Sequence, residues 1–136
     1  MPSSATKFLD QQITARMSRV CGGTIAAKRL VKIDGTDHTK IALAGANEKA
    51  NGVAEIDGAT GDEIPVATGG ILAVRAGGTI ALNDEVVSDS TGQVVARGTT
   101  ATTLYHVVGR AITQAASGEL VMIQWGPYAV WGANAS

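Results

Sequence analysis

A five-residue string, GGTIA, occurs twice in the chain, at residues 22–26 and 77–81. The two copies are 55 residues apart, and at the same offset Asp34 matches Asp89. Self-similarity at a fixed offset indicates two similar structural units that pack against each other, so it restricts the fold more than any single motif does. We interpret each GGTIA string as the opening strand of one unit.

A second match follows at an offset of 57, where residues 52–69 align with residues 109–126 without a gap. Glycines match glycines at three places in this block, and glycine is the residue that tolerates positive φ and close backbone approach. The change of offset places two extra residues in the second unit, around residues 98–106. We therefore predict two internal repeats, at about residues 22–74 and 77–131.

The periodicity within each repeat is typical of strands. Residues 63–66 and 120–123 are short runs rich in β-branched residues, and a Gly-acid turn precedes each. Turn signals recur every eight to twelve residues or so, as in small barrels and sandwiches. We predict a mainly β fold, a small β-barrel or sandwich, with residues 106–116 as a further strand. The repeats could close one barrel or form two lobes.

Residues 1–21 differ from the predicted β-domain, residues 22–136. Leu9, Ile13, Met17 and Val20 are spaced as on one face of a helix. The segment is also basic, with three Lys or Arg against one Asp. We predict an N-terminal arm, extended or helical, that docks on a neighbouring subunit; a tail that orders nowhere is the alternative.

The composition predicts a thin core. Hydrophobic residues make up 45% of the chain but aromatic residues only 4%, so the apolar content is mostly aliphatic and small. A chain of this kind gains stability by assembling with copies of itself or with a larger partner. The single cysteine, Cys21, is expected to be a small buried hydrophobe, since it has no intrachain disulfide partner.

Charge and hydropathy argue against two classes of partner. The formal net charge of −1 gives no basic surface for phosphates, so we expect no nucleic-acid binding. No apolar stretch has the length of a membrane-spanning helix, and the first residues lack the apolar run of a secretory signal. We expect no membrane partner and synthesis in cytoplasm-like conditions.

The inventory of catalytic groups is poor. His38 and His106 have no second histidine or cysteine at metal-ligand spacing, and no nucleophile motif or phosphate-binding loop is present. Acidic residues gather in turns, as at Asp34 and Asp37, but none of these turns has the pattern of an EF-hand loop. Aspartates in turns commonly accept hydrogen bonds from their own backbone. We predict no enzyme activity, no cofactor and no metal.

Aromatic side chains cluster near the C-terminus, in the segment QWGPYAVW. They are either part of the core or part of an interface, where Trp and Tyr supply much binding energy. Together with the apolar residues of the arm they give the predicted contacts with other subunits or with a larger partner: Phe8, Leu9, Ile13, Met17, Trp125, Tyr128 and Trp131.

Two segments, AGGTIALNDEVVSDSTGQVVA (residues 76–96) and VVGRAITQAASGELVMIQW (residues 107–125), resemble the capsid cement, or head decoration, proteins of tailed bacteriophages. In that family a glycine usually precedes the Asp of the first turn, whereas this chain has Asn83 there. The first repeat has Lys28 at the equivalent position. The positions that fit the family outline are Gly78, Asp84, Asp89, Gly92, Gly109, Ala111, Ala115, Ala116, Gly118 and Glu119.

The resemblance implies a β-rich structural protein, often trimeric. It implies attachment to the outer surface of the virion, where the protein locks contacts between major capsid subunits. Two other functions remain as alternatives. One is a glycan-binding surface module, which the aromatic cluster would serve; the other is a biotinyl- or lipoyl-like carrier domain, for which Lys40 and Lys49 are the only candidate lysines in the middle of the chain.

Overall fold

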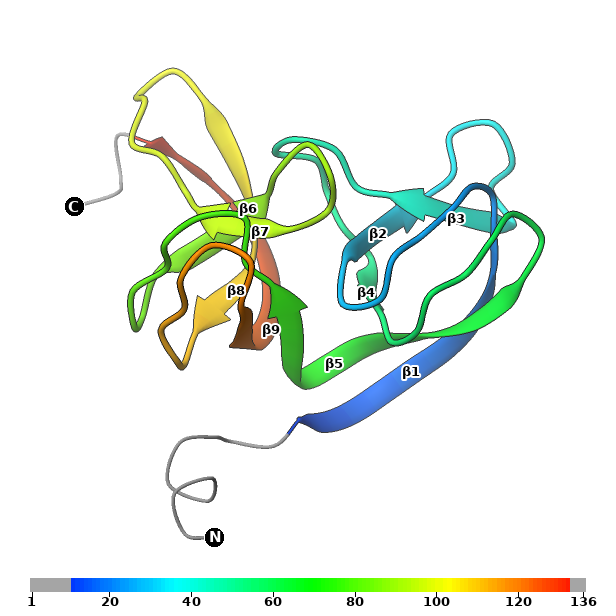
Figure 1. Cartoon of the computed structure of the whole chain (residues 1–136). Coiled ribbons are helices and arrows are strands. Elements are labelled where there is room, and N and C mark those ends of the chain that lie inside the picture. Colours follow the sequence, from blue (N-terminus) through cyan, green and yellow to red (C-terminus); the bar gives the residue numbers. More distant parts are fainter. Residues whose placement is uncertain (1–10, 133–136) are drawn as a thin grey trace, which may run out of the picture.

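A computed structural model describes residues 11–132, in which nine strands form one sheet and no α-helix is present (Figure 1). The prediction of a mainly β protein is confirmed. Within this range no helix is long and apolar enough to cross a membrane. The strands are β1 (Gln12–Cys21), β2 (Leu30–Ile33), β3 (Lys40–Leu43), β4 (Gly52–Ala54), β5 (Glu63–Arg75), β6 (Glu85–Ser88), β7 (Val94–Ala96), β8 (Leu104–Ala111) and β9 (Leu120–Trp131).

Strand β5 belongs to both groups of strands that Figure 1 shows. Its first part pairs antiparallel with β1 and β4, and its last part pairs antiparallel with β9. Ile71 is the point of change, because it lies opposite Gln12 on one edge and Gln124 on the other. The chain bends just before it, at Gly70, which has a φ of 100°.

The strand pairings of the two groups follow the same pattern. In the first group β1 pairs with β5, β5 with β4, β4 with β2 and β2 with β3, and β3 returns to β1 by a parallel pairing. In the second group β5 pairs with β9, β9 with β8, β8 with β6 and β6 with β7, and a parallel bridge joins Val94 to Ala76 at the end of β5.

Matching backbone hydrogen bonds accompany these pairings. The amide of Cys21 donates to the carbonyl of Asp62 at 2.7 Å, and that of Ala76 donates to Glu119 at 2.8 Å. Asn83 adopts the left-handed conformation, with a φ of 74°, which glycine adopts more readily than other residues. Lys28, 55 residues earlier, has a φ of 64°.

The interpretation of GGTIA as an opening strand is wrong. Gly22 and Gly23 form a bend, and the string contributes only an isolated bridge from Ile25 to Gly58. An aspartate approaches closely at this bend, since a Cβ on Gly22 would collide with the carboxylate of Asp34. A Cβ on Gly77 would collide with Asp89 in the same way, and Gly77 and Gly78 also form a bend.

The helical spacing of the N-terminal segment is also misleading. Residues 12–21 form β1, which lies antiparallel to β5 along most of its length. Ile13 packs against the core, whereas Met17 is 37% exposed. Apolar spacing in a short segment does not separate helix from strand, and here the available edge of β5 decides the conformation. Phe8 and Leu9 lie outside the described residues.

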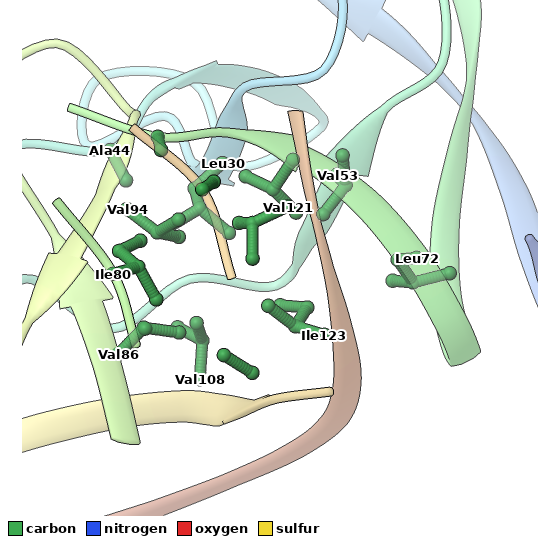
Figure 2. Close-up of a cluster of buried hydrophobic side chains, with 14 of the residues drawn as sticks. Leu30, Ala44, Val53, Leu72, Ile80, Val86, Val94, Val108, Val121 and Ile123 are labelled. Atoms are coloured by element: carbon green, nitrogen blue, oxygen red, sulfur yellow. The ribbon is translucent and has the colours of Figure 1, made fainter. Parts of the chain in front are cut away.

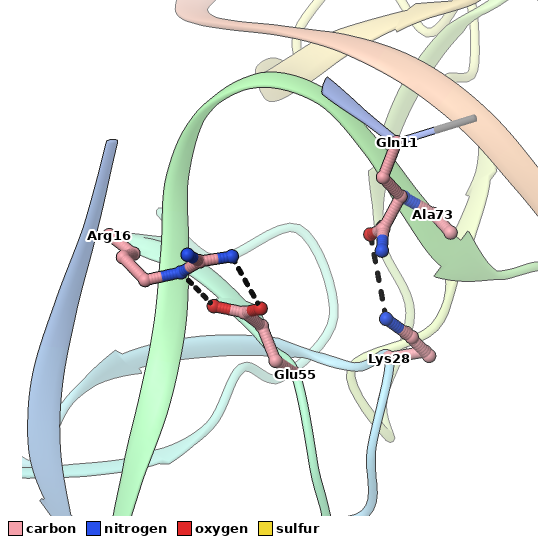
Figure 3. Close-up of polar contacts among 5 residues, drawn as sticks. All are labelled: Gln11, Arg16, Lys28, Glu55 and Ala73. Atoms are coloured by element: carbon pink, nitrogen blue, oxygen red, sulfur yellow. Dashed lines mark hydrogen bonds and ion pairs between the residues drawn. The ribbon is translucent and has the colours of Figure 1, made fainter. Parts of the chain in front are cut away.

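Polar contacts fasten β1 at two points (Figure 3). The Arg16 guanidinium binds both carboxylate oxygens of Glu55, with its Nε 2.9 Å and its Nη2 3.0 Å from them. Near the start of the strand, the Gln11 side-chain oxygen accepts hydrogen bonds from the amide of Ala73 at 3.0 Å and from the ammonium of Lys28 at 3.5 Å. Gln11 therefore ties β1 to β5 and to the turn before β2.

The main hydrophobic cluster, shown in Figure 2, draws on both groups of strands. Its buried members are aliphatic and include Leu30 and Val53 from the first group and Val86 and Ile123 from the second. A smaller cluster around Cys21, Ile41 and Ile64 lies within the first group. The thin aliphatic core predicted from composition is confirmed, and Cys21 is fully buried in it.

Replacing Gly70 with alanine is expected to destabilise the protein by at least about 2 kcal/mol. The new Cβ would collide with the carbonyl oxygen of Gln12, and the φ of 100° is unfavourable for any L side chain. Gly126→Ala is the matched control, since a Cβ there meets open space. Urea unfolding measures both variants, and equal stabilities would contradict the role given to Gly70.

Candidate functional site

The C-terminal aromatics divide between core and surface. Trp125 is partly buried and packs against the main hydrophobic cluster. Tyr128 and Trp131 are 44% and 50% exposed. All three lie on β9, whose last residues pair only with β8, so this end of β9 and the start of β8 form a two-stranded ribbon. The exposed aromatics are therefore carried on an extension of the sheet.

Asn47 joins this ribbon to the first group of strands. Its side-chain amide donates to the carbonyl of Leu104 at 2.8 Å and accepts from the amide of His106 at 2.9 Å. These two bonds imitate the pairing of a neighbouring strand along β8. The backbone amide of Asn47 donates to Ser88 at 2.8 Å, and the residue has a φ of 54°. The loop of residues 45–51 is thereby held against the second group.

A groove lies where this loop meets the ribbon. It consists of two adjoining pockets of about 370 and 470 Å³, which share Lys49, Asn51 and His106 as lining residues. One end reaches Lys32 on β2, and the other reaches Tyr128 on β9. We call this surface the junction groove. It combines residues from both groups of strands, so no single stretch of the sequence predicts it.

Positively charged side chains outnumber negatively charged ones in the junction groove. Glu48, the acidic residue of its lining, is bound to the Lys32 ammonium at 2.8 Å. That hydrogen bond, together with one from the backbone amide of Gly45, holds the pKa of Glu48 below its ordinary value. Lys49 is exposed and forms no ion pair with any residue between 11 and 132. One unneutralised ammonium group thus faces the groove.

The other polar residues singled out in the sequence lie apart from each other. His38 lies in the turn between β2 and β3, and Lys40 begins β3. His106 lies half-buried on β8, in the stretch that the sequence predicted as a strand. It pairs with Ala129 of β9.

The acidic turns have the structural role expected of aspartates in turns. The Asp34 carboxylate accepts from the amide of Thr36 at 2.8 Å and from that of Asp37 at 3.3 Å, and these bonds lower its pKa. Asp89 accepts from the amide of Thr91 at 2.8 Å in the same arrangement. Within residues 11–132 no three His, Cys, Asp or Glu side chains gather as metal ligands would.

The fold is that of a β-rich protein, and comparison with known proteins identifies its family. The family model of phage cement proteins matches residues 10–124. The chain belongs to the phage cement protein family, as the sequence motifs predicted. It is therefore a structural protein of a phage capsid.

A solved structure has a similar fold. It is the N base of the head fiber protein gp8.5 of bacteriophage phi29, with a TM-score of 0.68 and 24% sequence identity. The match covers 82% of this chain and 93% of the phi29 chain. The likeness therefore extends over both groups of strands. A comparison with curated proteins gave no match.

Replacing Asn47 with glycine is expected to loosen the ribbon and to lower stability by about 1–2 kcal/mol, because two hydrogen bonds are lost while glycine still tolerates the positive φ. Hydrogen exchange at the His106 amide should become faster. Asn51→Ala is the control, since the Asn51 side chain accepts from Ile33 and not from β8. Unchanged exchange at His106 in Asn47→Gly would contradict this function of Asn47.

Proposed function

We propose that the chain is a capsid decoration protein that binds the outer surface of a phage head and stabilises contacts between major capsid subunits. The observation that carries this proposal is the family match, which spans nearly all of the described strands. The phi29 relative in fold is a head fiber base, which is also a component of a phage head. Such a protein acts by buried area and by many copies on a lattice.

The exposed apolar side chains are the proposed contacts. Tyr128 and Trp131 stand on the ribbon, and Met17 lies on β1. Phe8 and Leu9 of the N-terminal arm complete the set. Ile13 and Trp125 pack on the main hydrophobic cluster, so we assign them to positioning β1 and β9 and not to direct contact.

We also propose that the protein assembles as a homotrimer. Several large hydrophobic side chains are at least one-third exposed in the single chain, among them Ile56 and Leu82. Contacts between copies would remove part of this surface from water. Each capsid-binding surface would then be present three times, which raises the strength of attachment by avidity.

The two groups of strands are, in this proposal, copies of one small barrel. The matched strand pairings, the equivalent bonds of Cys21 and Ala76 and the left-handed Lys28 and Asn83 support it. The first copy then begins with β1 and not at Gly22, and β5 supplies both the last strand of the first copy and the first strand of the second.

Glycan binding is the second candidate function, because exposed aromatic faces such as those of Tyr128 and Trp131 can stack on sugar rings. The two candidates differ in where the aromatics lie after assembly. A cement protein covers them on the capsid, whereas a glycan-binding protein leaves them open to solvent.

Substituting Phe8 and Leu9 together by alanine should weaken co-sedimentation with empty capsids of the parent phage by on the order of tenfold, since a few apolar anchors carry most binding energy. Ser3→Ala with Ser4→Ala is the matched control. Substitution is preferable to deletion of residues 1–20, which would also remove most of β1. Unweakened binding by a double variant with native melting temperature would exclude the arm as a contact.

Trp131 should become protected when the protein binds capsids. In Trp125→Phe, Trp131 is the one tryptophan left in the sequence. After the signal of capsids alone is subtracted, its quenching by acrylamide should fall on addition of capsids. Trp131→Phe reports on the partly buried Trp125, whose quenching should be weak and should change little. If Trp131 stays open to the quencher on saturated capsids, glycan binding becomes the better function.

A further inference from the structure

We propose that the junction groove holds an extended, acidic segment of the major capsid subunit, with a carboxylate of that segment bound to Lys49. This inference rests on the proposed capsid-binding function and names the surface that performs it. The groove is not one of the apolar contacts predicted from the sequence.

The shape of the groove fits an extended chain. The two pockets share three lining residues and together run from β2, past the loop of residues 45–51, to the ribbon. Along one wall lies the edge of β8, on which the Asn47 side chain already imitates a neighbouring strand. Because Asn47 already bonds to the backbone of Leu104 and His106, an extended peptide in the groove would be held through side-chain contacts and not by pairing with these two residues.

The charge selects an acidic segment. Lys32 is occupied by Glu48 at 2.8 Å, so the groove's acidic side chain is already neutralised. Lys49 remains as an exposed ammonium, and His106 adds a ring that can donate a hydrogen bond. The half-exposed ring of Tyr128 and the buried Val107 give the same groove an apolar wall. A carboxylate beside an apolar side chain is the complementary ligand.

Residues 1–10 and 133–136 of this chain are poor candidates for the acidic segment. Residues 1–10 carry one Lys and one Asp, so their side chains have no net negative charge, and residues 133–136 have no charged side chain. An acidic segment of another protein is the better match. In a capsid structural protein, the partner present at high local concentration is the major capsid subunit.

The test is Lys49→Glu in the full chain, measured by co-sedimentation with empty capsids of the parent phage. We expect binding on the order of tenfold weaker than wild type, because the reversed charge repels the carboxylate. Lys49→Ala should have a smaller effect, and added salt should reduce the difference between wild type and Lys49→Ala. Lys40→Glu is the control for charge reversal elsewhere on the surface, since Lys40 is half-exposed, lies 3.8 Å from the Asp37 carboxylate and does not line the groove.

The outcomes separate this inference from the proposed function. If wild type and Lys49→Glu bind capsids equally, the groove proposal is wrong and the cement function stands. If wild type does not bind capsids at all, both are wrong. If Lys49→Glu changes the mass of the free protein in light scattering, the groove is a contact between copies, and the capsid segment is excluded as its occupant. A native melting temperature for each variant shows that folding is unaffected.

Discussion

The structure depends on the sharing of β5 between two groups of strands. A 13-residue strand serves one group with its first part and the other with its last part. This is possible because Gly70 has no side chain where β1 crosses the bend. The main hydrophobic cluster then forms between the groups, from aliphatic side chains of both. Because the chain has few aromatic residues, both groups of strands are needed to form this cluster.

The asymmetry between the two groups produces the candidate binding surface. Where the second group continues β8 and β9 into a ribbon, the first has the loop of residues 45–51, and Asn47 holds the two together. The ribbon carries Tyr128 and Trp131 away from the core. The loop supplies Lys49 to the junction groove beside it. The apolar and charged contacts that we propose with a capsid therefore lie on neighbouring surfaces.

Much of the fold followed from local signals. Turn residues and β-branched runs located the starts of β5 and β9, because Gly and Asp mark turns by their backbone preferences. The repeated glycines marked close approaches of Asp34 and Asp89. The prediction of GGTIA as a strand failed, and the helical spacing of the N-terminal segment misled, because both segments take their conformation from partners distant in sequence.

The sequence by itself determined the mainly β class, the thin aliphatic core and the membership of the phage cement family, since these depend on composition and on short motifs. Only the tertiary structure decided that residues 12–21 join the sheet, that Trp125 supports the core while Tyr128 and Trp131 face solvent, and that Lys49 and His106 line one groove. The physical reason is that a strand edge or a groove is formed by residues far apart along the chain. A local sequence pattern does not predict which distant residues will lie in contact.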